Sequence, residues 1–354
     1  GIDLVKGTGA LAGIGEVVVQ PGGEIYKGKH IIIATGGHPR VFPGWEVDGE
    51  KVITSREALA LKELPAEIAI IGAGPIGLEF ATVWNRYGVK VTVIEAMSRI
   101  MPLEDEEVSR EAEVQFKKAG IVIRTGVKVE SFTTTENGVD MAMQTENGAE
   151  VLSVNKVLVA VGTAPALEGM GIEALGVEMN RGFVVVDDVM ATNVKGIYAI
   201  GDVTGKMPLA HTASAQALIV VDAIVGRKTQ VLNYTNIPRC IFGSIEVASV
   251  GMTEQQAKDK GIAVKIGKVN FLPNGKAVAI NENVGFAKVV ADEAGKILGV
   301  HMVGPHVTEM VAGGTTLVQL GITAEQAGLV VYPHPTLSEV LLDAIQAITG
   351  QGVH

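Results

Sequence analysis

Short apolar runs alternate with longer amphipathic stretches along most of the chain. Residues 14–36 fit a hairpin followed by a third strand, because a Pro-Gly-Gly turn separates two strand-like runs. Further runs typical of strands occupy 68–71, 89–94, 121–124, 157–161, 196–200, 248–250, 287–290 and 297–303. Apolar residues at helical spacing predict helices over 78–87, 104–118, 211–225, 307–320 and 336–348. This order predicts two α/β units followed by a C-terminal α+β unit.

A glycine-rich turn connects the predicted strand 68–71 to the helix after it. Gly72 permits a tight turn, Gly74 lets the backbone approach a pyrophosphate, and Gly77 lets helix and strand pack closely. The start of the helix offers N–H groups to phosphates, and a proline is compatible with its first turn. A structural turn without a ligand is the alternative. The predicted cofactor residues here are Gly72, Gly74, Pro75, Ile76 and Gly77.

Glu95 ends the next predicted strand, 18 residues after Gly77. A carboxylate at this place can accept hydrogen bonds from a ribose 2′-hydroxyl and repels a 2′-phosphate, so NAD is favoured over NADP. Arg99 lies nearby and is the one residue that favours NADP. We therefore predict an NAD site and keep NADP as the alternative.

Two other segments carry candidate chemistry. Gly201 and Asp202 end a predicted strand, where the carboxylate can bind a ribityl or ribose hydroxyl or act as an ordinary helix cap. His334 can move a proton near neutral pH, and Glu339 can orient its ring if the chain turns at the intervening proline. The alternative for Glu339 is a capping box with Thr336 that opens the last helix.

Composition narrows the function. The chain has 354 residues and a formal net charge of −10, which disfavours nucleic acid and anionic membranes as partners. No apolar run has the roughly 18 residues needed to cross a bilayer. Cys240 is the only cysteine, so the chain contains no intrachain disulfide and no cysteine-rich zinc site. We expect Cys240 to be a buried, unreactive thiol, and we expect structural roles for His301, His306 and His354.

Taken in order, these motifs resemble the FAD-dependent pyridine-nucleotide–disulfide oxidoreductases, and most closely the dihydrolipoamide dehydrogenases. The resemblance covers essentially the whole chain. It rests on the segment 34–37, the glycine turn with Glu95, Gly162, the pair Gly201-Asp202 and the segment 334–339. Members of the family begin with an FAD glycine loop and a Cys-x4-Cys pair, neither of which is present here.

The resemblance implies a fold and a domain organisation. The expected fold class is α/β, with a Rossmann-like NAD domain inserted in a partial FAD domain and followed by an α+β dimerisation domain. The partial FAD domain would comprise residues 1–60 and 183–230. The NAD domain would comprise residues 61–182, and the dimerisation or interface domain residues 231–354.

The resemblance also implies residue roles. Asp202, beside Gly201, would contact the ribityl chain of FAD, and Glu79 would lie where flavin and nicotinamide meet. His334, held by Glu339 and followed by a cis peptide bond, would be the acid/base for dithiol exchange at the flavin of the other subunit. Residues expected near the isoalloxazine ring are Leu209, Ala210 and His211. Residues expected at the two crossings between the FAD and NAD domains are Thr35, Gly36 and Gly162.

The implied activity is electron transfer from dihydrolipoamide through a disulfide and FAD to NAD. The implied partners are a second copy of the chain and the lipoyl-bearing proteins of 2-oxo-acid dehydrogenase complexes, with a cytoplasmic location, or the mitochondrial matrix in a eukaryote. Because the cysteine pair and FAD loop are missing, we expect an N-terminally truncated chain that is inactive in disulfide exchange. The alternatives are a flavin-free NAD(H)-binding dimer and an NADH-dependent diaphorase.

Overall fold

The computed structural model describes residues 1–350, so the predicted role of His354 lies outside the described residues. Contacts divide the chain into two units, each built from two separate segments. The first unit comprises Gly1–Arg40 with Thr163–Tyr234, and the second comprises Val41–Gly162 with Thr235–His354. The domain boundaries expected at 60, 182 and 230 stay predictions.

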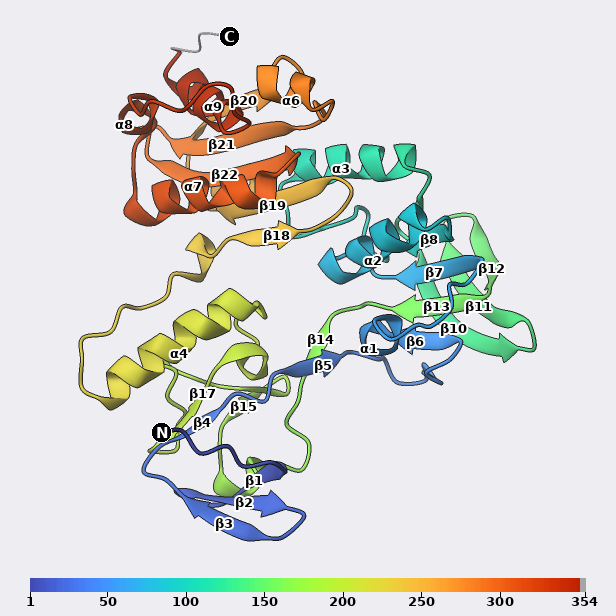
Figure 1. The fold of residues 1–354 in the computed structure, drawn as a ribbon, viewed down its shortest axis with the longest axis vertical. Coiled ribbons are helices and arrows are strands. Elements are labelled where there is room, and N and C mark those ends of the chain that lie inside the picture. The colour runs from blue at the N-terminus through green and yellow to red at the C-terminus, as the bar shows by residue number, and fades with distance from the viewer. Residues whose placement is uncertain (351–354) are drawn as a thin grey trace. The chain divides into compact units, whose positions relative to one another are not determined.

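The first unit consists of small sheets and one long helix (Figure 1). Strands β1 (Thr8–Gly13), β2 (Glu16–Gln20) and β3 (Glu24–Lys27) form an antiparallel sheet. The remaining strands pair in twos: β4 (Ile31–Ile33) with β17 (Ile197–Ala199), β5 (Gly37–Pro39) with β14 (Thr163–Pro165), and β15 (Met179–Asn180) with β16 (Phe183–Val184). Its helices are η1 (Glu173–Leu175), η2 (Gly201–Thr204) and α4 (Ala210–Ile224). The hairpin and third strand expected in 14–36 are present as β2, β3 and β4.

The second unit begins with a parallel sheet of order β6-β13-β7-β8-β9. Its strands are β6 (Val52–Thr54), β7 (Glu67–Ile71), β8 (Lys90–Ile94), β9 (Val122–Arg124) and β13 (Lys156–Val159). The helices between them are α1 (Ser55–Ala58), α2 (Pro75–Arg86) and α3 (Glu106–Lys118). The central strands are apolar and buried on both faces, as parallel strands covered by helices require.

An antiparallel meander of β10 (Lys128–Thr135), β11 (Gly138–Thr145) and β12 (Gly148–Val154) follows β9, and the sequence analysis did not predict it. Its strands alternate polar and apolar residues rather than forming apolar runs. The Asn137-Gly138 and Asn147-Gly148 pairs at its two turns are the signals that could have revealed it.

The C-terminal part of the second unit is an antiparallel sheet of order β18-β19-β22-β21-β20, drawn in yellow to red in Figure 1. Its strands are β18 (Arg239–Ile241), β19 (Glu246–Gly251), β20 (Val264–Asn270), β21 (Phe286–Asp292) and β22 (Ile297–Gly304). The helices are η3 (Tyr234–Asn236), which bridges the two units in sequence, α5 (Glu254–Asp259), α6 (Gly275–Ala279), α7 (Val307–Leu320), α8 (Ala324–Gly328) and α9 (Glu339–Thr349).

Helices α3 and α9 begin later in the chain than predicted. Helix α3 begins at Glu106 and not at 104, because the Asp105 side chain accepts a hydrogen bond from the Glu107 N–H and so caps the helix. Helix α9 begins at Glu339 with Ser338 as its N-cap, so the expected capping box with Thr336 is wrong. Only half of that box is formed, since Glu339 Oε2 accepts the Thr336 N–H at 2.7 Å.

Candidate functional site

The glycine turn in the second unit leaves no space at two of its three glycines. A Cβ added to Gly77 would lie 2.0 Å from the Gly72 carbonyl oxygen, and one added to Gly72, which has φ of 105°, would lie 2.3 Å from the Ala160 oxygen. A Cβ on Gly74 would meet no atom within 4 Å. The first and third glycines are thus required by packing, whereas the second borders open space, as a site for an approaching phosphate needs.

The start of helix α2 faces this open space without a side-chain cap. Its N-cap is Gly74, which makes no side-chain hydrogen bond, and Pro75 is in the first turn. The N–H groups of the first turn have no partner within a helix and carry the positive end of its dipole. The arrangement therefore fits an anionic diphosphate.

The Glu95 carboxylate is directed at the glycine turn. Its Oε2 accepts the Ala73 N–H at 2.9 Å, and its Oε1 accepts the Met97 N–H at 2.8 Å. The side chain is half-buried at the end of β8, next to the strand that leads into the turn. The structure thus brings Glu95 together with the glycines, and its expected contact with a ribose stays a prediction.

The guanidinium of Arg99 is engaged within its own segment. It donates to the carbonyl oxygens of Pro102 at 2.8 Å and Glu104 at 3.0 Å. It also donates to the Ser109 hydroxyl at 2.8 Å. A 2′-phosphate would have to displace these hydrogen bonds to reach the guanidinium. Arg99 therefore gives little support to NADP as the cofactor.

Glu79 lies one turn into α2 and contacts the segment after β18. Its Oε1 accepts the Phe242 N–H at 3.0 Å. Burial raises the pKa of the Glu79 carboxyl, and this hydrogen bond only partly opposes the rise. The contact holds α2 to the start of the antiparallel sheet.

In the first unit, the candidate FAD residues lie around η2 and α4. The Gly201 N–H donates to Gln216 Oε1 at 2.7 Å, which connects the two elements. Asp202 lies inside η2, whose N-cap is Ile200, so Asp202 is not a helix cap, and the alternative of an ordinary turn residue stays open. Leu209 precedes α4 as an N-cap without a side-chain hydrogen bond, and Ala210 and His211 begin the helix.

Thr212, in the first turn of α4, is a residue that the sequence analysis missed. It is 1 % exposed, and its hydroxyl has no hydrogen-bond partner among the described residues. A buried hydroxyl without a partner fits a site completed by a bound polar group. No local signal reveals it, because a threonine in an apolar helix usually bonds a carbonyl of the preceding turn.

Three residues lie close to the places where the chain passes between the two units: Thr35, Gly36 and Gly162. Thr35 donates its hydroxyl to the Ala166 oxygen at 2.7 Å, and Gly36 follows with φ of 75°. Gly162, with φ of 112°, is the last residue before the chain returns to the first unit. Their expected role as crossings between cofactor domains stays a prediction.

The pair predicted at the C-terminus is formed. His334 Nδ1 lies 2.9 Å from Glu339 Oε1, and the His334-Pro335 peptide bond is cis. Glu339 is thereby shared between the imidazole and the Thr336 N–H, while the His334 side chain is 77 % exposed. The ring is oriented through Nδ1, and the geometry leaves Nε2 as the nitrogen that can meet a substrate proton.

Cys240 lies in β18 and is half-buried. Burial, together with the carboxylates of Glu246 and Glu104, raises the pKa of its thiol to about 11. At neutral pH the sulfur is therefore protonated and a poor nucleophile, in agreement with the predicted unreactive thiol.

Comparison with known proteins identifies the chain's relatives. The family model for pyridine nucleotide-disulphide oxidoreductases matches residues 2–217, and the model for the dimerisation domain of the same family matches residues 237–345. The chain belongs to the pyridine nucleotide-disulphide oxidoreductases. This family uses FAD and NAD and contains a dimerisation domain, so the predictions of family, fold class, enzyme class and cofactors are confirmed.

Curated relatives in this family are named dihydrolipoyl dehydrogenases. The Bacillus subtilis protein is 42% identical, and the alignment covers 100% of this chain and 77% of that protein. The Mycobacterium leprae protein is 44% identical over 92% of this chain and 70% of its own length. Among solved structures, LpdA from Mycobacterium tuberculosis has a TM-score of 0.89 at 27% identity, covering 97% of this chain and 76% of the other. The flavoprotein disulfide reductase RclA from Escherichia coli has a TM-score of 0.88 at 28% identity, covering 97% and 79%.

None of the helices within residues 1–350 combines the length and apolar character that a bilayer crossing requires. The same residues contain no group of three or more His, Cys, Asp or Glu side chains arranged to hold a metal ion.

Proposed function

We propose that the protein acts in the dihydrolipoyl dehydrogenase reaction, in which electrons pass from dihydrolipoamide through a disulfide and FAD to NAD. The 354 residues, with Cys240 as their only cysteine, supply residues for NAD, for part of FAD and for proton transfer, and do not supply the disulfide. The observation that carries this proposal is the pair of His334 and Glu339, whose Nδ1 and Oε1 are 2.9 Å apart. Relatives at 35% to 44% identity bear the same name. Bound flavin and nicotinamide supply the redox chemistry, and the protein supplies binding, orientation and proton transfer.

The described residues bind NAD through the glycine turn and Glu95. Gly74 leaves space at the start of α2 that would accept the diphosphate, and the Glu95 carboxylate, which accepts the Ala73 N–H, would also accept the ribose hydroxyls. Arg99, engaged with backbone oxygens, offers little to a 2′-phosphate. This residue set favours NAD over NADP.

The described residues of the first unit hold part of FAD. Asp202 would bind the ribityl chain, and residues at the start of α4 would hold the isoalloxazine ring. The buried Thr212 hydroxyl gains a hydrogen-bond partner when this site is filled. The assignment adds Thr212 to the set of Gly201, Asp202, Leu209, Ala210 and His211.

His334 acts as the base toward dihydrolipoamide. Its Nε2 accepts the proton of the attacking thiol, and the imidazolium that forms is stabilised by the Glu339 carboxylate on the opposite nitrogen. In a dimer formed through the matched dimerisation domain, this ring would serve the flavin held by the second subunit. We further propose a cytoplasmic location and the lipoyl-bearing proteins of 2-oxo-acid dehydrogenase complexes as partners.

The proposed function is tested on the protein purified at its full encoded length. We expect the yellow absorption of bound flavin, NAD reduction with dihydrolipoamide, and much slower reduction of NADP. A yellow protein that passes electrons from NADH to a dye but never oxidises dihydrolipoamide would contradict the proposal and support the diaphorase. A colourless protein that binds NADH would support the flavin-free dimer, an alternative suggested by the single, unreactive Cys240.

Substitutions in the glycine turn distinguish a ligand site from a structural turn. Gly77→Ala forces a Cβ against the Gly72 oxygen, and we expect a loss of about 1–3 kcal/mol of stability by overpacking. In Gly74→Val the added Cβ meets no atom within 4 Å, so the stability should stay near that of the wild type while NADH binding weakens by roughly tenfold or more. Thermal unfolding and calorimetric titration with NADH measure the two effects. Wild-type affinity in Gly74→Val would show that no phosphate approaches there.

A further inference from the structure

A single row of polar side chains crosses the antiparallel sheet of the second unit. Strand pairing places Arg239 opposite Ser249, Ser249 opposite His301, His301 opposite Lys288, and Lys288 opposite Lys268. The row thus takes one residue from each of the five strands. It lies on the face whose flanking residues Val247, Phe286 and Val303 pack with residues of the parallel-sheet part. A polar row across an otherwise apolar contact requires a matching partner.

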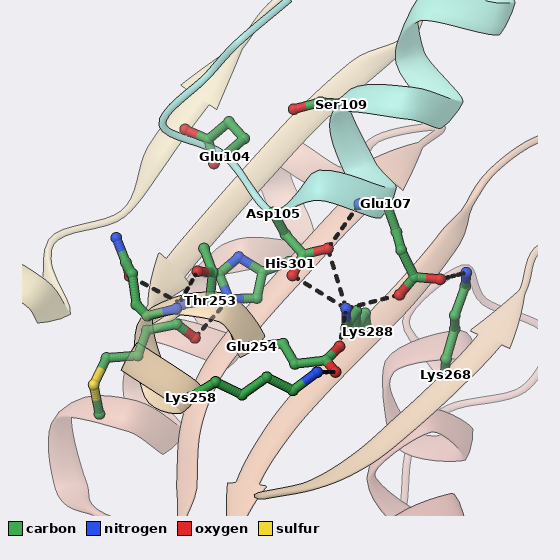
Figure 2. A network of polar contacts seen from close by, with 12 residues as sticks. Glu104, Asp105, Glu107, Ser109, Thr253, Glu254, Lys258, Lys268, Lys288 and His301 are labelled. Carbon is green, nitrogen blue, oxygen red and sulfur yellow. Dashed lines mark hydrogen bonds and ion pairs between the residues drawn. The ribbon is translucent and has the colours of Figure 1, made fainter. Parts of the chain in front are cut away.

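The partner is the acidic segment at the start of α3 (Figure 2). Glu104, which is 7 % exposed, accepts from Arg239 Nε at 2.8 Å and from the Ser249 hydroxyl. Asp105, the N-cap of α3, accepts from Lys288 Nζ at 3.1 Å. Glu107 pairs with two lysines. Its Oε2 lies 2.7 Å from Lys288 Nζ, and its Oε1 lies 2.6 Å from Lys268 Nζ.

The charges of this network balance. Four cations, Arg239, Lys258, Lys268 and Lys288, face four anions, Glu104, Asp105, Glu107 and Glu254. His301 adds no charge, because burial lowers the pKa of its imidazole. Its Nε2 donates to the Met252 oxygen at 2.9 Å, and its Nδ1 has no partner among the described residues. Buried ion networks contribute little net stability but can specify one arrangement of the parts they connect.

The ion network holds the segment 99–105 in place, and this segment in turn contacts the glycine turn. The Met101 N–H donates to the Ala73 oxygen at 3.0 Å, and Met101 itself is 2 % exposed with φ of 45°. A bulky side chain adopts such a backbone conformation only where its surroundings impose it. Here Ser109 donates to the Met101 oxygen at 3.0 Å, and Arg99 bonds the backbone on the far side of the turn.

We propose that Glu104, held by Arg239 and Ser249, is a positioning residue for the nucleotide site. The antiparallel sheet β18-β19-β22-β21-β20 fixes the segment 99–105 through this carboxylate, and the segment fixes Ala73 in the glycine turn through Met101. The affinity for NAD(H) is thereby set partly by the antiparallel sheet, which itself does not touch the nucleotide. The inference rests on the proposed function, because it requires a nucleotide at the glycine turn.

The test measures NADH affinity by calorimetry and KM and kcat for NADH with an artificial electron acceptor, at a temperature where every variant is folded by circular dichroism. We expect Glu104→Ala to raise both the dissociation constant and KM about tenfold, with kcat little changed, because the turn is misplaced. Glu104→Gln keeps an acceptor for Arg239 and Ser249 and should restore most of the affinity. Glu106→Ala is the matched control, since Glu106 is an exposed glutamate two residues after Glu104, at the start of α3, and pairs only with Arg110 among the ion pairs found in residues 1–350.

Wild-type affinity in a folded Glu104→Ala variant would overturn the inference. If the Glu104→Ala variant does not fold, Ser109→Ala serves as the test. This substitution removes only the hydroxyl that connects Arg99 to the Met101 oxygen, and we expect it to raise the KM for NADH as well. Unchanged KM in Ser109→Ala would then overturn it. A wild-type protein that shows no NADH binding would instead contradict the proposed function itself, so the two failures are distinguishable.

Discussion

His334→Gln should lose about 10²-fold or more of the dihydrolipoamide-dependent reduction of NAD, because removal of a general acid–base group typically costs this much. Glutamine can still donate to Glu339 and so keep the local turn, but it cannot accept the thiol proton. Steady-state kinetics on the full-length protein, with dihydrolipoamide as the varied substrate, measure the loss. Glu339→Gln should lower the rate less, because it leaves an acceptor for the ring but removes the charge that stabilises the imidazolium.

Reduction of a dye by NADH is an internal control for the His334→Gln variant. Electron transfer from NADH to a dye needs no thiol proton, so His334→Gln should reduce the dye at the wild-type rate. His30→Gln replaces an exposed histidine of the first unit and should alter neither rate. Equal losses of dye reduction and dihydrolipoamide oxidation in His334→Gln would contradict the proposed role and indicate a damaged fold.

Lys288→Met should reduce the free energy of unfolding by about 3–5 kcal/mol, the usual cost of removing one partner of a buried ion pair. Lys288 is 1 % exposed, and its ammonium is shared by the carboxylates of Asp105, Glu107 and Glu254. Without it, Asp105 keeps a buried charge with only the N–H groups at the start of α3 near it. Urea unfolding at pH 7 measures the loss.

The loss should depend on pH in a defined direction. Burial alone would raise the pKa of Glu107, but the ammonium groups of Lys268 and Lys288 outweigh it and lower that pKa. Lys258 and Lys288 lower the pKa of Glu254. A carboxyl group whose pKa is lower in the folded state stabilises the fold above its unfolded pKa and loses this contribution as pH falls through the folded value. Wild-type stability should therefore fall on acidification, and the difference from Lys288→Met should shrink.

Lys117→Met is the matched control for Lys288→Met. Lys117 pairs with Glu113 on the outer surface of α3 and is about half exposed. A surface pair of this kind contributes at most about 1 kcal/mol. A Lys288→Met protein that unfolds at the same urea concentration as Lys117→Met at pH 7 would refute the role given to the buried network.

Much of the α/β framework could be predicted from local patterns. Strands β7 and β8 and helix α7 lie within a residue of the predicted bounds, because continuous apolar runs and helical spacing are local properties. Helix α2 begins three residues earlier than predicted, since Pro75 and Gly77 are poor helix formers in general, but a proline suits a first turn. The capping box of Thr336 and Glu339 is only half formed, because the Thr336 hydroxyl donates to the Pro333 oxygen and the helix begins after Ser338, which spacing alone does not reveal.

By itself, the sequence determined the motifs whose partners are close along the chain: the glycine turn that opens α2, and a histidine and glutamate separated by one tight turn at a proline. Only the tertiary structure decided the row from Arg239 to Lys268. Lys288 stands in a strand that looks like plain core, and Ser249 and His301 are single polar residues in apolar runs. Strand register brings these distant positions into line, and register is set by backbone pairing across the whole sheet and by the acidic segment packed on it. The physical reason is that side chains far apart in sequence acquire a common environment only after the chain has closed the loops between them.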